Sequence, residues 1–190
     1  MSNRVVVAFT GATGQLFGVK ALELLDETPY ESHLILSRAA KMNLEQESDQ
    51  SVEEVRELAD TAYNVQNVGA PPASGSFRTQ GTLVCPCSMK TLSNIAHGNA
   101  GNLITRTADV SLKERQPLVL MPREKPLNRI HIQNMLDVTD AGGIIYPPFL
   151  SFYQRPDSLE EAVTRTMARA LSFLGVDVSF DEWDGMSINE

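Results

Sequence analysis

The sequence predicts a three-layer α/β fold, in which a parallel sheet is covered by helices on both faces. Short apolar runs of strand length alternate along the chain with longer segments whose apolar residues recur at helical spacing. The strand runs are apolar at nearly every position, which is typical of strands buried on both faces. Hydrophobic residues make up 42% of the 190 residues, which suffices for one well-packed core. We therefore expect a single domain over residues 1–176 and an acidic tail over 177–190.

The first half of the chain alternates strands and helices and then enters a long loop. The helix expected after the first strand has Val19, Leu22 and Leu25 on one face. The next helix begins at Ser51, a favourable N-cap residue, and has acidic residues in its first turn. The expected elements are strands at 4–9 and 32–36, helices at 15–26 and 51–61, and a Gly/Pro/Ser loop at 69–81.

The second half repeats the strand–helix alternation. A long last helix is expected between the N-cap Ser158 and the stop residue Gly175. The expected elements are strands at 82–86, 117–122 and 143–148, and helices at 88–97, 102–116, 128–142 and 158–174. Because ligands in such folds bind beyond the carboxyl ends of the strands, functional residues should directly follow strands.

The charge and the cysteines narrow the function classes. A net charge of −8 argues against nucleic-acid binding. No apolar run approaches the roughly 20 residues that span a bilayer, and the first strand begins too early to leave room for a signal peptide. Cys85 and Cys87 match neither a disulfide framework nor a zinc pattern. We expect a cytoplasmic protein with reduced thiols and no metal.

The stretch "TGATGQLFG" at 10–18 joins the first strand to the first helix and is typical of a phosphate-binding loop. A nicotinamide-dependent short-chain reductase would show a similar loop. Such a reductase needs a tyrosine with a lysine four residues later. None of the four tyrosines of the chain has one. The sequence therefore disfavours the reductase.

Three further stretches resemble the UbiX-type flavin prenyltransferases, in the wider family of flavin-binding, homo-oligomeric proteins. They are "CPCSMKTLSNIAHGNAGNLITRTADVSLKERQPLVLMPREKPLNRIHIQNM" at 85–135, then "FYQRP" and then "MARALSFLG". The motifs keep the order and separation that the family has, and the resemblance runs from Val5 to about Gly175. It implies a flavodoxin-like, Rossmann-like fold and a homo-oligomer, often a dodecamer, whose neighbouring subunits complete each site.

The resemblance also implies an activity. These enzymes transfer a dimethylallyl group from dimethylallyl monophosphate to N5 and then C6 of reduced FMN, without a metal. The product, prenylated FMN, serves a partner UbiD-type decarboxylase. The sequence leaves open whether the donor is the monophosphate or the diphosphate. It also leaves open a flavoprotein that only binds or carries FMN or prenylated FMN, and less readily a decarboxylase of cysteinyl peptides.

Two departures from the family pattern keep the carrier alternative open. Thr13 stands where the family has serine, so the hydroxyl is kept and a methyl group is added. Lys125 stands where threonine is common and adds a cation beside Glu124.

By resemblance, the cofactor contacts follow the predicted strands. They are Gly11, Ala12, Thr13, Ser37, Ser88, Met89, Lys90, Thr91 and Arg123. We expect the amides of the glycine loop and the start of the helix at 15–26 to hold the FMN phosphate or its ribityl chain.

The resemblance assigns the chemistry to a second set of residues. The catalytic residues are Glu124, Lys113, Arg106 and Glu47, and the prenyl donor is bound by Tyr153, Arg169, Arg123 and Lys113. Arg106 and Lys113 are seven residues apart and share one helical face, which suits two cations that converge on a phosphate. The same spacing also suits a solvated face on which both pair with Asp109 and Glu114.

Overall fold

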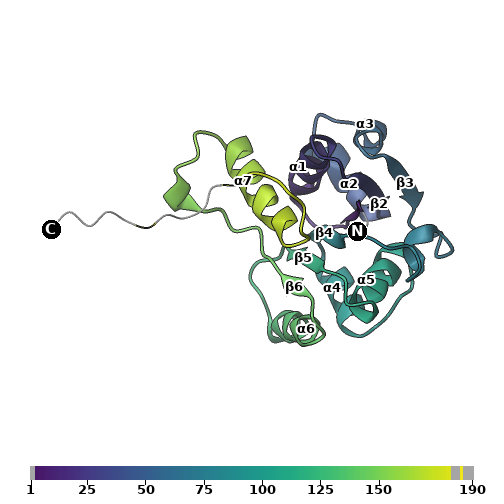
Figure 1. Cartoon of the computed structure of the whole chain (residues 1–190). Helices are drawn as coiled ribbons and strands as arrows, with labels where there is room; N and C mark the ends of the chain where they lie inside the picture. Colours follow the sequence, from purple (N-terminus) through teal and green to yellow (C-terminus); the bar gives the residue numbers. More distant parts are fainter. Residues whose placement is uncertain (1–2, 181–184, 186–190) are drawn as a thin grey trace.

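A six-stranded parallel sheet forms the centre of the computed structural model, which describes residues 3–180 and 185 (Figure 1). The strand order is β3-β2-β1-β4-β5-β6, and every neighbouring pair is parallel. The strands are β1 (Arg4–Phe9), β2 (Glu31–Leu36), β3 (Thr61–Asn64), β4 (Gly81–Cys87), β5 (Leu118–Pro122) and β6 (Ile144–Ile145). The predicted parallel sheet is therefore confirmed.

Helices cover both faces of the sheet, which confirms the predicted three layers (Figure 1). On one face lie α1 (Gln15–Asp26), α2 (Arg38–Glu47), α3 (Val52–Glu57) and α7 (Leu159–Ser172). On the other lie α4 (Met89–Ala96), α5 (Leu103–Lys113) and α6 (Arg129–Asp140). Two short 3-10 turns, η1 (Pro71–Ala73) and η2 (Phe152–Gln154), lie in the connecting loops.

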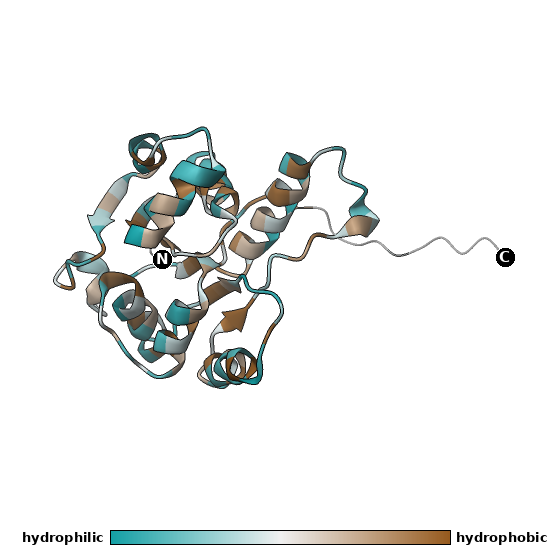
Figure 2. Cartoon of the chain, turned by 180° about the vertical axis from the view of Figure 1, so that it is seen from behind, coloured by the Kyte–Doolittle hydropathy of each residue, from teal (hydrophilic) through white to brown (hydrophobic). Residues whose placement is uncertain are grey.

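The alternation of side chains along β1 divides the core into two clusters. Val5, Val7 and Phe9 pack toward α1 and α7, whereas Val6 and Ala8 pack toward α4 and α5. In Figure 2 the central strands are coloured as hydrophobic, while the surrounding helices carry both hydrophilic and hydrophobic residues. Strand β1 is therefore buried on both faces.

The strand order reverses at β1, since the chain first adds β2 and β3 on one side and then β4, β5 and β6 on the other. The carboxyl ends of β1 and β4 therefore lie side by side while their connections leave in opposite directions. Such a switch point leaves a crevice at the edge of the sheet. The residues after these strands are the glycine loop and Ser88.

The expected elements need four corrections. The chain enters a helix directly after β2, which the sequence analysis did not predict, because α2 buries only Ala40 and Leu44 and so lacks an apolar stripe. The helix expected at 51–61 covers only Val52–Glu57, and Thr61–Asn64 forms an unpredicted edge strand. The helix expected at 102–116 ends at Lys113, and Arg115 takes a left-handed φ of 59°. The strand expected at 143–148 shortens to Ile144–Ile145.

The acidic tail expected over 177–190 lies largely outside the described residues, so the division into a domain and a tail stays a prediction. Within the described part of the chain, no helix has the length and apolar character that crossing a membrane requires.

We predict that Gly18→Ala destabilises the fold. A methyl group at Gly18 in α1 would lie 2.5 Å from the ring of Phe9 and 2.7 Å from the carbonyl oxygen of Cys85. Overpacking of this kind costs about 1–3 kcal/mol, although alanine ordinarily favours a helix more than glycine does. The free energy of unfolding, measured by urea denaturation, should fall by that amount. Gly101→Ala is the control, because a methyl group there meets nothing within 4 Å; equal stability of both variants would contradict the packing described.

Candidate active site

A pocket of about 390 Å³ opens at the carboxyl edge of the sheet, at the switch point beside β1 and β4. The glycine loop, the start of α2, the start of α4 and the residue before α5 form its walls. It is lined by Thr10, Gly11, Ser37, Arg38, Ala39, Met42, Ser88, Lys90, Thr91, Asn94 and Asn102. Five residues of the predicted cofactor set thus lie around one pocket: Gly11, Ser37, Ser88, Lys90 and Thr91.

Two helices begin at this pocket, and a serine caps each of them. The Ser37 hydroxyl accepts a hydrogen bond from the Ala40 amide at 3.0 Å, and the Ser88 hydroxyl accepts one from the Thr91 amide at 3.3 Å. The N-terminus of a helix carries a partial positive charge and free amide donors. The starts of α2 and α4 therefore make the pocket attractive to an anion such as a phosphate.

A third hydroxyl joins the two central strands under the pocket. The Thr10 Oγ1 atom donates to the carbonyl oxygen of Pro86 at 2.8 Å and accepts from the Ser88 amide at 2.7 Å. The Thr10 amide also donates to Pro86, at 3.1 Å. These bonds fix the start of α4 relative to the end of β1. Thr10 was not among the predicted site residues, although its place directly after the first strand is a signal for it.

The charged side chains of this pocket are all cationic. Arg38 and Lys90 line it and are exposed, and no aspartate or glutamate is part of its lining. Because the chain as a whole has a net charge of −8, this local excess of positive charge is a property of the site. Two cations, two helix starts and several hydroxyls suit a phosphate group.

The glycine loop lies so close to α2 that it needs glycine at Gly11. A methyl group on Gly11 would lie 2.5 Å from the Cβ atom of Ala39. The buried Gln15 side chain braces the loop from inside, because its Nε2 atom donates to the carbonyl oxygens of Thr10 at 2.9 Å and Ala12 at 2.6 Å. At the end of the loop Gly14 adopts a left-handed φ of 97°. The loop is thus held rigidly against the start of α2.

The amides at the start of α1 are occupied by a carboxylate of the chain itself. Glu47 Oε2 accepts hydrogen bonds from the amides of Gly14 at 2.7 Å and Gln15 at 3.1 Å. In this chain Glu47 therefore provides the anion that these two amides favour, and the expectation that this helix start holds the cofactor phosphate stays a prediction. Glu47, predicted as a catalytic residue, lies at the end of α2 and caps α1.

The other predicted cofactor residues do not line the pocket. Ala12 is buried, Thr13 is half-buried next to it, and Met89 packs against the core cluster under α4. Arg123 follows β5, and its amide donates to the carbonyl oxygen of Cys87 at 3.1 Å. That bond places Arg123 at the same edge of the sheet as Ser88.

Glu124 lies on the exposed loop that leaves this edge. Its Oε1 atom accepts a hydrogen bond from the Lys125 amide at 3.0 Å. The carboxylate remains exposed, so it is accessible to a ligand that enters over the end of β5.

Within the single chain, the cations of α5 are paired rather than directed at the pocket. Arg106 donates to the carbonyl oxygen of Ala73 at 3.1 Å and to Asp109 Oδ2 at 2.5 Å, while Lys113 pairs with Glu114. Lys113 ends α5, about 10 Å along the helix axis from Arg106, and the chain then enters the amino end of β5. This is the ion-paired face that the spacing also predicted.

Tyr153 and Arg169 lie in a separate group beyond β6. Tyr153 belongs to η2 and is 58% exposed, and the Arg169 guanidinium lies over the Phe173 ring at 4.6 Å. Tyr146 lies near both residues. Burial raises the pKa of its phenol, and the charges of Arg169 and Tyr153 act on that pKa with smaller and opposite effects. Figure 1 shows η2 on a segment that extends beyond α7 and away from the sheet.

The two cysteines belong to the core. Cys85 and Cys87 are buried in β4 as free thiols, as predicted. Burial raises the pKa of the Cys85 thiol well above its ordinary value and that of Cys87 to about 12, so both stay protonated. Among the described residues, no three His, Cys, Asp or Glu side chains are grouped so that they would hold a metal ion.

Comparison with known proteins agrees with the resemblance seen in the sequence. Residues 1–168 match the family described as Flavoprotein. The chain is 46% identical over 188 residues to the flavin prenyltransferase UbiX of Neisseria meningitidis. The aligned region covers 98% of this chain and 100% of the relative.

The solved structures similar to this chain include UbiX and UbiX-like proteins. A crystal structure of AnUbiX in complex with FMN and dimethylallyl pyrophosphate has a TM-score of 0.95 and 45% identity, covering 98% of this chain and all of that one. A dodecameric FMN-dependent UbiX-like decarboxylase from Escherichia coli has a TM-score of 0.92 and 43% identity, covering 96% of this chain and all of that one. The flavodoxin-like fold is thereby confirmed.

We predict that Glu47→Ala destabilises the protein with no ligand present. The variant leaves the amides of Gly14 and Gln15 without their acceptor, and loss of an N-terminal cap costs about 0.5–2 kcal/mol. Glu47→Gln keeps an acceptor oxygen and should lose less. Urea denaturation measures both changes, with Glu45→Ala, an exposed residue of the same helix, as the control. If Glu47→Ala were as stable as Glu45→Ala, the capping role would be refuted.

Proposed function

The chain belongs to the UbiX-type flavin prenyltransferases of the Flavoprotein family, and from this premise we propose that it transfers a dimethylallyl group from dimethylallyl phosphate to reduced FMN. Its cofactor is FMN, and its product is prenylated FMN. The observation that carries the proposal is the anion-binding pocket at the starts of α2 and α4. We further propose that a partner UbiD-type decarboxylase receives the product.

The cofactor phosphate belongs, in this proposal, at the starts of α2 and α4. Both helices present capped N-termini to the pocket, with Arg38 and Lys90 beside them. The start of α1 is not assigned this role, because Glu47 accepts the hydrogen bonds of its amides. When bound, reduced FMN supplies the two ring atoms to which the dimethylallyl group becomes bonded while the carbon–oxygen bond to its phosphate breaks. The flavin ring would extend from the pocket toward the end of β5, where Arg123 and Glu124 lie.

The remaining residues have roles around the leaving phosphate. Arg123 at the end of β5 would hold the phosphate as its negative charge grows. Glu124, exposed beside it, would move a proton between the flavin and the departing group. We keep Tyr153 and Arg169 as the residues that bind the prenyl donor, and Arg106 and Lys113 as further cations for its phosphate.

These residues lie in separate groups of one chain, so the proposed site needs more than one copy. The segment that carries Tyr153 also presents Phe149 and Phe152, which are 81% and 83% exposed. Exposed aromatic side chains grouped in this way are typical of an interface between subunits. We propose a homo-oligomer, a dodecamer like the Escherichia coli structure, in which Tyr153 and Arg169 of one copy and α5 of another reach a shared site.

A cytoplasmic location completes the proposal. It is supported by the two free buried thiols, because reducing compartments keep cysteines unpaired.

The activity is tested by anaerobic incubation of the purified protein with reduced FMN and dimethylallyl monophosphate, followed by mass spectrometry of the extracted flavin. The proposal expects a flavin heavier by one isoprene unit. The diphosphate is offered in a parallel reaction to identify the donor. Unmodified flavin with both donors, although FMN is bound, would overturn the transferase and favour the carrier that the sequence left open.

We predict that two substitutions separate donor binding from chemistry. Arg169→Ala should raise the KM for the donor about tenfold or more while the affinity for FMN is unchanged, because a cation that binds only the donor is lost. Glu124→Gln should lower kcat about a hundredfold with FMN still bound, because a proton carrier is lost. Arg115→Gln, at an exposed position near the amino edge, is the control. If either variant lost FMN binding and turnover to the same extent, the substituted residue would have a structural role instead.

A further inference from the structure

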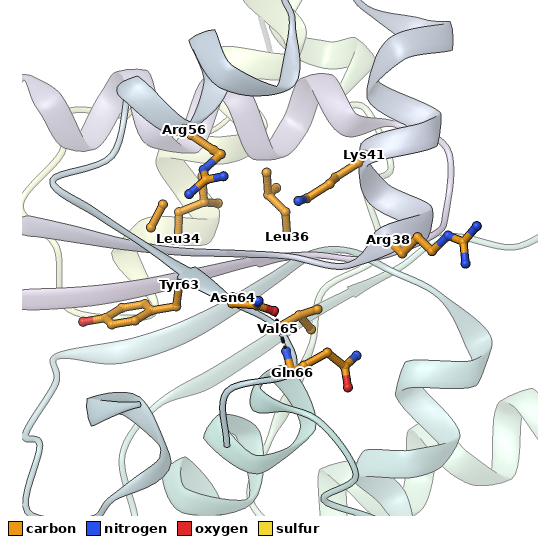
Figure 3. A pocket seen from close by; sticks show the side chains of 10 residues that line it. Leu34, Leu36, Arg38, Lys41, Arg56, Tyr63, Asn64, Val65 and Gln66 are labelled. Carbon is orange, nitrogen blue, oxygen red and sulfur yellow. Dashed lines mark hydrogen bonds between the residues drawn. The ribbon is translucent and has the colours of Figure 1, made fainter. Parts of the chain in front are cut away.

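A second pocket, of about 380 Å³, lies over the outer strands β2 and β3, beneath α2 and α3 (Figure 3). Pockets for small molecules have volumes of about 300–1,000 Å³, so its size suits one compact ligand. Its lining includes Leu34, Leu36 and Ala62 from the strands and Arg38, Lys41 and Arg56 from the helices. None of these except Arg38 belongs to the cofactor pocket.

The floor of this second pocket is apolar because of the register between its two strands. Leu34 pairs with Ala62, and Leu36 pairs with Asn64. Side chains two residues apart lie on the same face of a strand, so the two leucines and Ala62 all face α2 and α3. Leu34 is fully buried and Leu36 is 5% exposed, so the apolar surface that a ligand would meet is Ala62 and the edge of Leu36.

Two cations face each other above this floor. Lys41 comes from α2 and Arg56 from α3, and Figure 3 shows both side chains pointing into the same space over Leu34 and Leu36. Arg38 lies at the rim and points outward in the same view. No aspartate or glutamate lines the pocket. An anion between Lys41 and Arg56 would offset their mutual repulsion.

These cations are little used by the protein itself. Among the described residues, the Lys41 ammonium has neither an ion pair nor a hydrogen bond. Arg56 has one acidic neighbour, Glu53, at 3.6 Å on the same helix, and the Glu53 side chain is 74% exposed. The chain has 24 acidic residues against 16 lysines and arginines, yet among the described residues Lys41 has no acidic partner and Arg56 has only the long pairing with the exposed Glu53.

The lower wall adds a polar group. The Asn64 Oδ1 atom accepts the Gln66 amide at 3.0 Å, which fixes the orientation of the Asn64 side chain (Figure 3). Its amide nitrogen is thereby left to donate a hydrogen bond. Donors and cations on the walls and an apolar floor are complementary to one kind of molecule.

We propose that this pocket binds a small organic anion, in which a carboxylate or phosphate monoester is joined to a compact apolar group. The anionic group lies between Lys41 and Arg56, and the apolar group rests on Ala62 and on the accessible edge of Leu36. The site is separate from the cofactor pocket, with Arg38 of α2 at the boundary between them. Arginine and lysine at such a site bind carboxylates and phosphates through charge-assisted hydrogen bonds.

Calorimetric titration of the full-length, FMN-saturated protein tests this proposal, with phenyl phosphate, benzoate and inorganic phosphate as probes. Saturation with FMN keeps the probes out of the cofactor pocket. We expect phenyl phosphate or benzoate to bind at one site per chain, and inorganic phosphate about tenfold or more weaker, since it has no apolar group to bury. Comparison of the first two probes identifies the preferred anionic group.

Variants locate the site. The double variant Lys41→Gln/Arg56→Gln should lose about tenfold or more in affinity for the organic probe, whereas Arg115→Gln should bind it as the wild type does. Ala62→Leu fills the pocket without a change of charge and should also abolish binding, so the test does not depend on the folding of one variant. Binding that survives both variants, no binding of either organic probe, or equally tight binding of inorganic phosphate would overturn the proposal.

Discussion

The hydrogen bonds from the amides of Gly14 and Gln15 to the Glu47 carboxylate decide which helix starts are left for a ligand. Three helices begin near the switch point of the sheet, and each start has amide donors that favour an anion. At the start of α1, the Glu47 carboxylate of the same chain accepts the hydrogen bonds of these amides. The starts of α2 and α4 are then the ones that open into the pocket, and our proposal therefore places the phosphate of the cofactor there.

Helix α2 contributes to the site through both of its ends. Its first turn carries Ser37 and Arg38 at the wall of the pocket, and its last residue is Glu47. The close contact between Gly11 and Ala39 holds the helix against the glycine loop, and Gln15 braces that loop from beneath. A loop that resembles a dinucleotide-binding motif thus works here as a rigid support for α2. Our proposal assigns recognition of the flavin phosphate to the two serine-capped helices beside it, α2 and α4.

The sequence predicted the parts of the fold and the site that local patterns encode. The apolar strands, the helix caps at Ser51 and Ser158 and the pocket residues after β2 and β4 were all found from patterns within a few residues. Helix α2 was missed because it buries only two side chains, and β3 was missed because none of its residues is fully buried. The two amides that donate to Glu47 lie 33 and 32 residues earlier in the chain. No spacing rule could predict these contacts.

The central claim, that the starts of α2 and α4 hold the cofactor phosphate, is tested most directly by the relative affinities for FMN and riboflavin in Ser88→Asp. Aspartate caps a helix as well as serine does, but it brings a negative charge to the start of α4. The account predicts that FMN affinity falls about a hundredfold or more through charge repulsion, while riboflavin binds as it does to the wild type. Ser158→Asp, which places the same charge at the start of α7, should leave both affinities unchanged. An unaltered preference for FMN in Ser88→Asp would contradict the account and place the phosphate elsewhere.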